Sequence, residues 1–311
     1  MNVLMTGGSG LIGRSVAADL TRAGHRVTVL TRSPQKAAAL LPPQVTAHPW
    51  DAISLNGWAS LVNQAEAIIN LAGESIAGEN LTAILTRRWT ADYKRRIAAS
   101  RRKVGQLLTT AVEQAKNRPR VFVQASAVGY YGDSSERDVD ESAPPGDDFL
   151  ARVCADWEAS TAPLEALGLR RVIIRTGLVL APRGGILPVM LLPVRMFVGG
   201  PLGSGKQALP WIHLADEAAA IRALLEDENA SGPYNLSAPN PVTQAEFVRI
   251  AGRVLRRPVF VPAPALALKL ALGEKAALVL EGQRAVPKRL LAAGYRFQFP
   301  ELAPALQDLL G

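Results

Sequence analysis

Residues 1–13 read Met-Asn-Val-Leu-Met-Thr-Gly-Gly-Ser-Gly-Leu-Ile-Gly, a short apolar run followed by a turn rich in glycine. Val3 to Met5 predict a buried strand, and apolar residues recur at helical spacing from Leu11 to Leu20. A strand, a glycine turn and a helix in this order are typical of a dinucleotide-binding unit, in which phosphates sit on the helix N-terminus.

Two glycine fingerprints overlap in this turn. Gly7, Gly10 and Gly13 fit G-x-x-G-x-x-G, while Gly8, Gly10 and Gly13 fit G-x-G-x-x-G. We expect Gly7 to turn the chain sharply, Gly10 to let backbone N–H groups approach a pyrophosphate, and Gly13 to let the helix pack closely on its strand. A glycine turn with no ligand is the alternative.

The second predicted strand, Arg26 to Leu30, ends without the carboxylate that usually binds a ribose 2′-hydroxyl. Thr31-Arg32-Ser33 follows it, so a guanidinium and two hydroxyls stand where an anion is expected. Because arginine presents a planar fork suited to phosphate, we expect NADP(H) rather than NAD(H) as the cofactor. The alternative is that Arg32 is a solvated surface residue.

Length and composition indicate a globular protein with a substantial core. The 311 residues, 48% hydrophobic and 20% charged, suffice for one large α/β domain or for a nucleotide domain with a smaller lobe. The one cysteine, Cys154, cannot form an internal disulfide, and we expect an inert buried thiol rather than a nucleophile. No signal segment precedes the first strand, so we expect a cytoplasmic protein without an integral membrane contact.

The distribution of charge argues against two further function classes. The net charge of +8 is dispersed in pairs such as Arg87-Arg88 and Arg256-Arg257, without a basic arm or interleaved aromatic residues. An anionic cofactor, or an acidic substrate, therefore explains the charge better than nucleic acid does. His25, His48 and His213 are scattered, and no ligand spacing for a metal ion appears.

Strands and helices alternate along the first half of the chain. Further strands are predicted at Ala67–Leu71, Val121–Gln124 and Arg171–Arg175, with helical stretches at Leu85–Ala115 and Leu150–Leu167. This order predicts an α/β fold, a Rossmann-type doubly wound parallel sheet that binds ligands beyond the carboxyl ends of its strands. We expect residues 1–180 to form the NADP-binding domain, open to a later returning strand, and residues 181–311 to form mostly a smaller C-terminal substrate lobe.

The C-terminal part has predicted helices near Leu214–Leu225, Gln244–Leu255, Ala263–Leu272 and Leu302–Leu310. We expect the Ala- and Leu-rich stretch Ala263–Leu272 to belong to the core. The apolar stretch Ile186–Val198 is interrupted by prolines and is too short to span a bilayer. It is interpreted as a segment of the substrate lobe, with a peripheral membrane contact as the alternative.

Further motifs follow the predicted strands: Asn70-Leu-Ala-Gly-Glu74, Gln124-Ala-Ser126 with Gly129-Tyr-Tyr-Gly132, and Arg175-Thr-Gly177. Together with residues 6–13 they resemble the extended and atypical short-chain dehydrogenase/reductase superfamily. More narrowly the chain resembles the epimerase-family, nucleoside-diphosphate-sugar epimerase-like group, with Ser100-Arg101 and Pro210-Trp-Ile-His213 as supporting signals. The resemblance covers essentially the whole chain, including a region from about Pro258 that is peculiar to the group.

The resemblance implies roles for residues around a bound cofactor. It assigns the pyrophosphate to Gly7, Gly10, Leu11, Ile12 and Gly13, the adenosine ribose and its phosphate to Thr31 and Arg32, the adenosine side to Leu71, Ala72 and Gly73, and the nicotinamide side to Ala125, Ser126, Thr176, Gly177 and Val179. Arg101 is a further cofactor-binding candidate. Glu74 and His213 are substrate candidates, with a loop cap and a structural histidine as the alternatives.

The chain departs from the family at its catalytic pair. Competent relatives carry Tyr-x-x-x-Lys after the fifth strand, where this chain reads Phe149-Leu-Ala-Arg-Val153, so that neither the phenol nor the ammonium is present. Ser126, Tyr130 and Tyr131 remain as catalytic candidates, with Arg or Lys help, for instance from Lys94. The alternative is that both tyrosines pack or bind substrate without exchanging protons.

Two classes of function fit these observations. The first is an NADP(H)-binding oxidoreductase or epimerase-like protein that acts on a small carbonyl or hydroxyl substrate, for instance a sugar-derived one, bound between the two lobes. The second is a non-catalytic NADP(H)-sensing regulatory protein, motivated by the loss of the Tyr-Lys pair. Turnover of a substrate separates the two classes.

Overall fold

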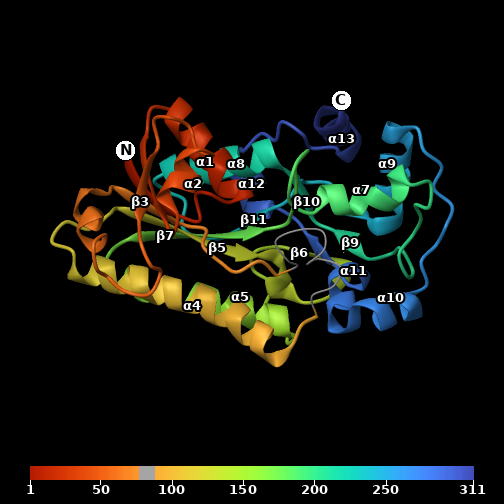
Figure 1. Cartoon of the computed structure of the whole chain (residues 1–311), viewed down its shortest axis with the longest axis horizontal. Coiled ribbons are helices and arrows are strands. Elements are labelled where there is room, and N and C mark those ends of the chain that lie inside the picture. Colours follow the sequence, from red (N-terminus) through yellow and green to blue (C-terminus); the bar gives the residue numbers. More distant parts are fainter. Residues whose placement is uncertain (77–87) are drawn as a thin grey trace.

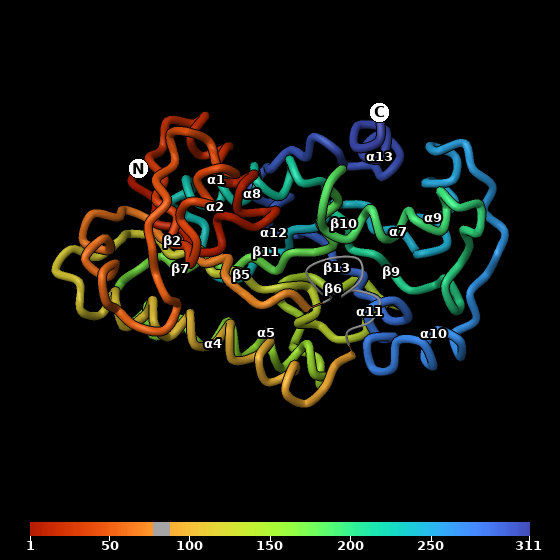
Figure 2. The backbone as a smooth tube through the Cα atoms, in the orientation of Figure 1, coloured from red at the N-terminus to blue at the C-terminus, as the bar shows by residue number. Residues whose placement is uncertain are grey.

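A seven-stranded sheet forms the centre of the computed structural model, which describes residues 1–76 and 88–311 (Figures 1 and 2). Its strands are β1 (Asn2–Thr6), β2 (Arg26–Thr31), β3 (Thr46–Pro49), β4 (Ala67–Asn70), β5 (Val121–Ala127), β7 (Arg170–Thr176) and β11 (Gly232–Leu236). Every neighbouring pair in this sheet is parallel, in the order β11-β7-β5-β4-β1-β2-β3. The predicted Rossmann-type doubly wound sheet is therefore confirmed.

The strand order reverses beside β1. The chain runs outward from β1 to β3 and then returns to place β4 on the other side of β1, so that β1 pairs with both β2 and β4. Connections leave such a switch point in opposite directions, which opens a crevice at the carboxyl ends of the strands. Thr6 and Asn70, which are paired in register at these ends, therefore mark the place where a ligand is expected.

Helices cover both faces of the sheet (Figure 1). One face carries α1 (Leu11–Arg22) and α8 (Leu214–Glu226), and the other carries α4 (Ala91–Gln114), α5 (Phe149–Ala159) and α6 (Pro163–Ala166). The side chains of β1 alternate accordingly, since Val3 and Met5 join the core under α1 while Leu4 joins the core under α4.

Two predicted helices differ from those in the structure. The stretch Leu85–Ala115 becomes α4, which begins at Ala91 because the Thr90 side chain accepts a hydrogen bond from the Tyr93 backbone N–H; residues 85–87 lie outside the described residues. The single helix predicted at Leu150–Leu167 is wrong, because the chain there forms α5 and then α6, with Pro163 in the first turn of the second helix.

Residues beyond 180 contribute to both halves of the molecule. β11 and α8 complete the sheet and its upper face, whereas α7 (Leu187–Arg195), α9 (Gln244–Leu255) and α13 (Leu302–Leu310) pack around a separate apolar cluster at the other end. The remaining strands are β6 (Ser134–Val139), β8 (Leu178–Leu180), β9 (Ala208–Leu209), β10 (Trp211–His213), β12 (Val242–Thr243) and β13 (Gln283–Ala285). The remaining helices are α2 (Pro34–Ala38), α10 (Ala265–Leu272), α11 (Ala277–Leu280), α12 (Lys288–Ala292) and the 3-10 turns η1 (Ala59–Gln64), η2 (Val128–Tyr131) and η3 (Gly273–Ala276).

The prediction that Ala263–Leu272 belongs to the core is wrong. None of the residues of α10 is buried, and Leu266 and Leu270 are 70% and 72% exposed. The helix lies at the outer edge of the C-terminal lobe (Figure 1). The stretch Ile186–Val198 forms α7, and within the described ranges no helix combines the length and apolar content that crossing a bilayer requires.

Candidate cofactor cleft and the buried network beneath it

The glycine turn between β1 and α1 leaves no room for side chains. Gly7 has φ +70°, and a Cβ there would lie 2.7 Å from the carbonyl carbon of Leu71, which follows β4. A Cβ at Gly13 would lie 2.3 Å from the Gly7 carbonyl oxygen. Gly10 is the N-cap of α1 and has no side chain that could accept a hydrogen bond. The first N–H groups of the helix therefore have no anionic partner in the described part of the chain. This cradle fits the diphosphate of a dinucleotide.

The residues predicted for the adenosine end lie where β2 ends. Thr31 is buried, and its Oγ1 accepts a hydrogen bond from the Ser33 backbone N–H at 3.3 Å. Arg32 is exposed beside it. An exposed guanidinium at this strand end is free to meet a phosphate, and its selection of NADP(H) stays a prediction.

A chain of buried side chains ties the carboxyl ends of β1, β4 and β5 together. Thr6 Oγ1 donates to Asn70 Oδ1 at 2.7 Å, and Asn70 Nδ2 donates to Gln124 Oε1 at 3.0 Å. Gln124 Nε2 in turn donates to the carbonyl oxygen of Ala125 at 2.7 Å. Because each of these side chains is fully satisfied in a low dielectric, the floor of the crevice is held in one arrangement.

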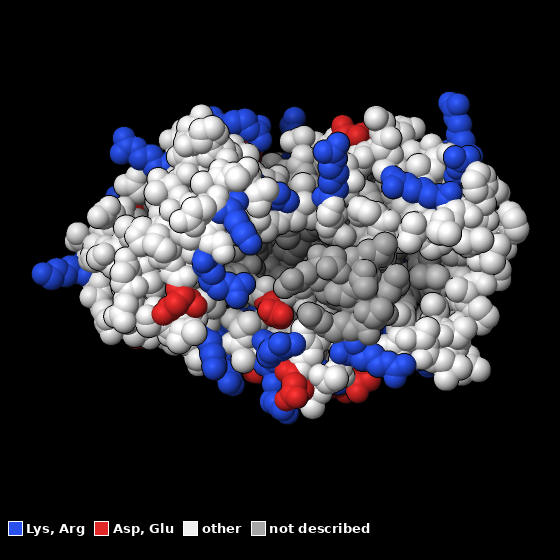
Figure 3. All heavy atoms as spheres, in the orientation of Figure 1, with Lys and Arg blue, Asp and Glu red and all other residues white. Residues whose placement is uncertain are grey.

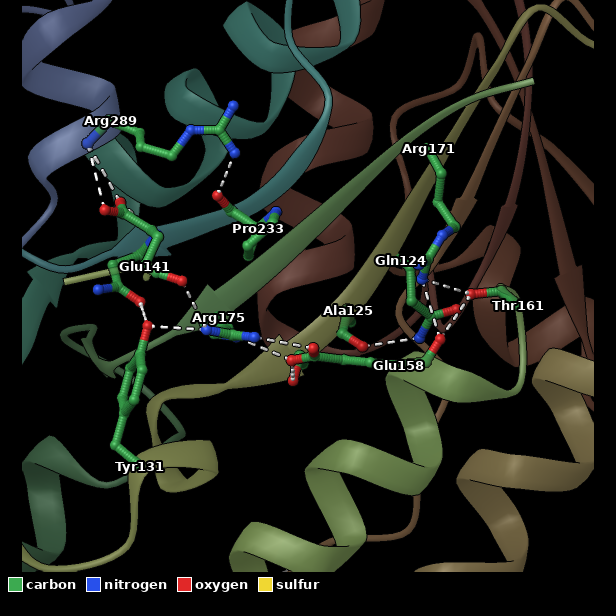
Figure 4. A network of polar contacts seen from close by, with 12 residues as sticks. Gln124, Ala125, Tyr131, Glu141, Glu158, Thr161, Arg171, Arg175, Pro233 and Arg289 are labelled. Carbon is green, nitrogen blue, oxygen red and sulfur yellow. Dashed lines mark hydrogen bonds and ion pairs between the residues drawn. The ribbon is translucent and has the colours of Figure 1, made fainter. Parts of the chain in front are cut away.

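A buried ion pair continues this floor toward β7 (Figure 4). Arg175 reaches Glu158 with two donors, Nε at 2.9 Å and Nη2 at 3.0 Å, and the Ser126 hydroxyl donates to the same carboxylate at 2.6 Å. Burial opposes the charged form of Arg175, but the hydrogen bonds and charge of Glu158 outweigh it and raise the pKa of Arg175. The Ser126 proton is therefore committed to Glu158.

The two candidate tyrosines have different surroundings. The Tyr131 hydroxyl donates to Asn235 Oδ1 at 2.7 Å and accepts from Arg175 Nη1 at 3.0 Å, and burial raises the pKa of Tyr131 to about 12 despite the nearby cation. Tyr130 is only partly buried, and Arg175 Cζ lies 3.5 Å from the centroid of its ring. Tyr130 therefore carries a cation–π contact on its ring face.

Glu141 and Arg289 close the network on the far side. Glu141 Oε1 accepts from the Asn235 backbone N–H at 3.0 Å, and the Arg289 backbone N–H lies 3.3 Å from both Glu141 oxygens (Figure 4). No sequence motif predicts a role for Glu141, Glu158, Asn235 or Arg289. The available signal was a charge inside an apolar segment, such as Arg175 after Val-Ile-Ile, since a charge buried in this way requires a partner.

The positions that replace the catalytic pair carry apolar side chains that pack mainly on other apolar residues. The Phe149 ring packs on Trp89 with centroids 5.5 Å apart, and Val153 is buried against Ile97. The proposed help from Lys94 is wrong, because its ammonium pairs with Glu274 and lies 5.1 Å above the Phe149 ring. Arg175 is the cation that contacts both tyrosines.

Arg101 and Gly73 meet on the α4 side of the crevice. A Cβ at Gly73 would lie 3.1 Å from Arg101 Cζ, and this guanidinium lies 4.9 Å from the Trp157 ring centroid. The Glu74 backbone N–H donates to Ser100 Oγ at 3.1 Å, which holds the segment after β4 against the helix. The side chain of Glu74 has no described contact that gives it a role.

Thr176 is the last residue of β7, and Gly177 and Val179 follow it. Thr176 Oγ1 donates to Glu217 Oε1 at 2.8 Å, and burial raises the pKa of this fully buried acid to about 8. The Gly177 N–H donates to Leu236 O at 2.9 Å, and a Cβ at Gly177 would lie 2.0 Å from Pro210 O. The N–H group of Gly177 is therefore bound to a neighbouring strand, and the space beside its Cα is filled by backbone. Val179 is buried.

His213 lies at the start of α8 rather than beside the tyrosines. Its Nδ1 accepts from the Ala215 backbone N–H at 3.1 Å, its ring packs on Phe299, and its Nε2 lies 3.3 Å from Asp308 Oδ2. Burial lowers the pKa of His213. These contacts describe a helix cap, which is the structural alternative stated above.

Two further chemistries have no assembled site in the described part of the chain. Cys154 is buried, and burial raises the pKa of its thiol to about 12, which suppresses the reactive thiolate. Among residues 1–76 and 88–311, no three His, Cys, Asp or Glu side chains are grouped to hold a metal ion. Figure 3 shows Lys and Arg side chains spread over this face of the molecule, both above and below its centre.

Comparison with known proteins agrees with this geometry. Residues 3–237 match the model of the "NAD dependent epimerase/dehydratase family", and residues 263–309 match a "Domain of unknown function (DUF1731)". The bovine protein "Epimerase family protein SDR39U1" is 39% identical over 313 residues, and "Epimerase family protein YfhF" of Bacillus subtilis is 38% identical over 314 residues. The alignments cover all of this chain, all of the bovine protein and 98% of YfhF.

A solved structure extends the comparison to the fold. The crystal structure of human epimerase family protein SDR39U1 with NADPH superposes with a TM-score of 0.87 and 36% sequence identity, covering 99% of each chain. The resemblance inferred from the glycine turn and the strand-end motifs is thus confirmed. The chain belongs to the NAD dependent epimerase/dehydratase family.

Proposed function

We propose that this chain binds NADP(H) across the carboxyl ends of β1, β2, β4 and β5. The glycine cradle supports the proposal, because any side chain at Gly7 or Gly13 would collide with backbone. The exposed Arg32 at the end of β2 supports NADP(H) over NAD(H), and the human relative with 36% identity was crystallised with NADPH.

Replacing Arg32 by alanine is expected to lower the affinity for NADPH by about 10- to 100-fold and to change NADH affinity little, since hydrogen bonds to a charged group contribute roughly 1.5–3 kcal/mol. Titration calorimetry with both nucleotides measures this. Lys36→Ala removes another exposed basic side chain nearby and is the matched control. Equal affinities of the unaltered chain for NADPH and NADH would contradict the assignment.

We further propose an oxidoreductase or epimerase-like reaction on a small carbonyl or hydroxyl compound, with Tyr130 as the proton-exchanging residue. The single observation that carries this is the Arg175 guanidinium, 3.5 Å from the Tyr130 ring centroid, while the Tyr131 hydroxyl is committed to Asn235 and Arg175. A bound nicotinamide supplies hydride transfer, so the chain has to orient the substrate and move one proton. Arg175 acts through Tyr130 and is a positioning residue.

Ser126 complements this role as an acceptor. Its hydroxyl proton is given to Glu158, so its remaining lone pairs can only accept a hydrogen bond. A substrate hydroxyl fits such a group better than a carbonyl oxygen does. This favours hydroxyl-bearing, sugar-like compounds within the proposed class.

Tyr130→Phe is expected to lower turnover by about 10²- to 10⁴-fold while NADPH affinity is retained, because general acid–base groups contribute this much. Turnover is measured by absorbance with a panel of small compounds, as NADP+ reduction with hydroxyl-bearing, sugar-like compounds and as NADPH oxidation with carbonyl compounds. Tyr131→Phe is the matched control and is expected to lower stability by roughly 1–3 kcal/mol, because Asn235 loses a buried partner. Full turnover of Tyr130→Phe would exclude Tyr130 as the proton donor.

A non-catalytic NADP(H) sensor is the second candidate. The apolar side chains of Phe149 and Val153 favour it, since neither residue can exchange a proton or carry a charge. It requires tight NADPH binding with no turnover of any compound in the panel. A partner protein whose affinity changes with NADPH would then be its signature.

A further inference from the structure

An apolar surface is exposed at the end of the C-terminal lobe. Residues 196–198, which follow α7, are 63%, 50% and 51% exposed, and Phe260 is 69% exposed. The two segments lie side by side, because the backbone N–H groups of Phe260 and Val261 both donate to the carbonyl oxygen of Gly199, at 3.0 and 3.1 Å. They form one surface, the apolar tip, which consists of Met196, Phe197, Val198, Phe260 and Val261.

The backbone holds Phe197 outward at a cost in free energy. Its φ is +62°, in the left-handed region that favours glycine and that a bulky side chain rarely adopts. Phe260 is exposed although its neighbour Val259 packs toward α9, where a Cβ at Gly252 would lie 2.4 Å from Val259 Cγ2. An exposed apolar surface of this kind, with a strained aromatic residue in it, is typical of an interaction site.

Basic side chains flank the apolar tip. Arg195 is the exposed last residue of α7, and Arg257 Cζ lies 4.3 Å from the centroid of the Phe197 ring. The sequence stretches that build this end of the lobe, 176–215 and 247–273, contain three and five Lys or Arg residues respectively, and no Asp or Glu. Figure 3 shows Lys and Arg side chains at the upper right of the molecule, where Figure 1 places α9. The surroundings of the tip are therefore positively charged.

This combination fits the surface of a membrane that contains anionic lipids. Apolar side chains enter the boundary of the acyl region, while arginines meet the headgroup phosphates. A second copy of the chain fits less well, because a two-fold contact through the tip would bring the arginines of both copies together. We propose that the apolar tip docks the protein peripherally on an anionic lipid surface. The proposal does not depend on the proposed function, and it develops the peripheral contact considered for the stretch Ile186–Val198.

Co-sedimentation of the full chain with vesicles tests the proposal. The vesicles contain phosphatidylcholine alone, or phosphatidylcholine with about 30% phosphatidylserine. We expect the chain to bind the anionic vesicles more tightly than the neutral ones, and the difference to shrink as salt is added, because salt screens the exposed arginines.

The first variant removes the two aromatic side chains. Phe197→Asn combined with Phe260→Ser is expected to lower the affinity for anionic vesicles by about 10-fold or more, because this apolar area no longer leaves water. The melting temperature should stay close to that of the unaltered chain, since both side chains are exposed and asparagine tolerates the left-handed backbone. Ile53→Ser, at an 83% exposed position of the N-terminal half, is the matched control.

The second variant removes the flanking charge. Arg195→Gln combined with Arg257→Gln is expected to lower the affinity for anionic vesicles by roughly 5-fold for each arginine, and to change binding to neutral vesicles little. Arg102→Gln combined with Lys103→Gln removes two exposed charges from α4 and is the matched control. An equal loss in both charge variants would overturn the proposed place of contact.

Three further results would overturn the proposal. One is an unaltered chain that stays in the supernatant with the anionic vesicles. Another is a dimer in sedimentation velocity that Phe197→Asn with Phe260→Ser dissociates, without vesicle binding, which identifies a second copy as the occupant. The third is binding to immobilised polyglutamate but not to vesicles, which identifies an acidic protein instead.

Discussion

Glu217→Gln is expected to stabilise the folded chain by several kcal/mol at pH 8 and above. Glu217 is fully buried, its Oε2 has no hydrogen-bond partner among residues 1–76 and 88–311, and burial raises its pKa from 4.5 to about 8. Each unit of pKa difference between the folded and unfolded chain corresponds to about 1.4 kcal/mol. Glutamine keeps the oxygen that accepts from Thr176 and removes the charge.

The sign of this effect follows from the proton that Glu217 holds. Between pH 4.5 and about 8 the unfolded chain has lost this proton while the folded chain retains it, so stability falls as the pH rises through this window. Below pH 4.5 both states are neutral at this position and the two proteins should agree. Urea unfolding at several pH values measures the difference, with the exposed Glu113→Gln as control. Parallel curves for Glu217→Gln and the unaltered chain would show that Glu217 is ionised when buried.

Glu158→Gln is expected to lower the free energy of unfolding by roughly 3–5 kcal/mol at neutral pH, because it leaves the Arg175 guanidinium buried without its counter-charge. Adding Arg175→Met to this variant should recover a large part of the loss, since no buried charge then remains. Urea unfolding of the two single variants and the double variant measures their coupling.

A matched control is available in α6, which covers the same face of the sheet as α5. Glu165 also pairs with an arginine, Arg171, but its side chain is 54% exposed, so Glu165→Gln should cost less than about 1 kcal/mol. Losses that simply add in the Glu158 and Arg175 double variant would contradict the proposed coupling.

Local patterns were sufficient to predict the layers of this fold. The alternation of apolar strands with amphipathic segments predicts the parallel sheet. The helices at Gln244–Leu255 and Leu302–Leu310 also occur where the sequence predicts them. The core assignment of Ala263–Leu272 failed because burial depends on a neighbouring layer, and apolar composition does not reveal that α10 buries none of its residues within the described chain.

The candidate site was predictable where it depends on short motifs and unpredictable where it depends on distant partners. The glycine turn signals a close approach of backbone within one segment. The partners of Arg175 and Glu141 cannot be read in this way, because Glu158 lies on α5 whereas Arg175 lies on β7, and Asn235 lies 94 residues beyond Glu141. Local periodicity contains no information about which buried charges meet.

The position of β11 has a consequence for the synthesis of the chain. β11 pairs with β7 at the edge of the sheet, and α8 covers α1, yet both come from residues 214–236. A nascent chain of 180 residues would therefore expose the unpaired backbone of β7 and the apolar surface under α8. The first 180 residues therefore cannot complete their fold independently during translation, because they stay prone to aggregation until β11 has left the ribosome.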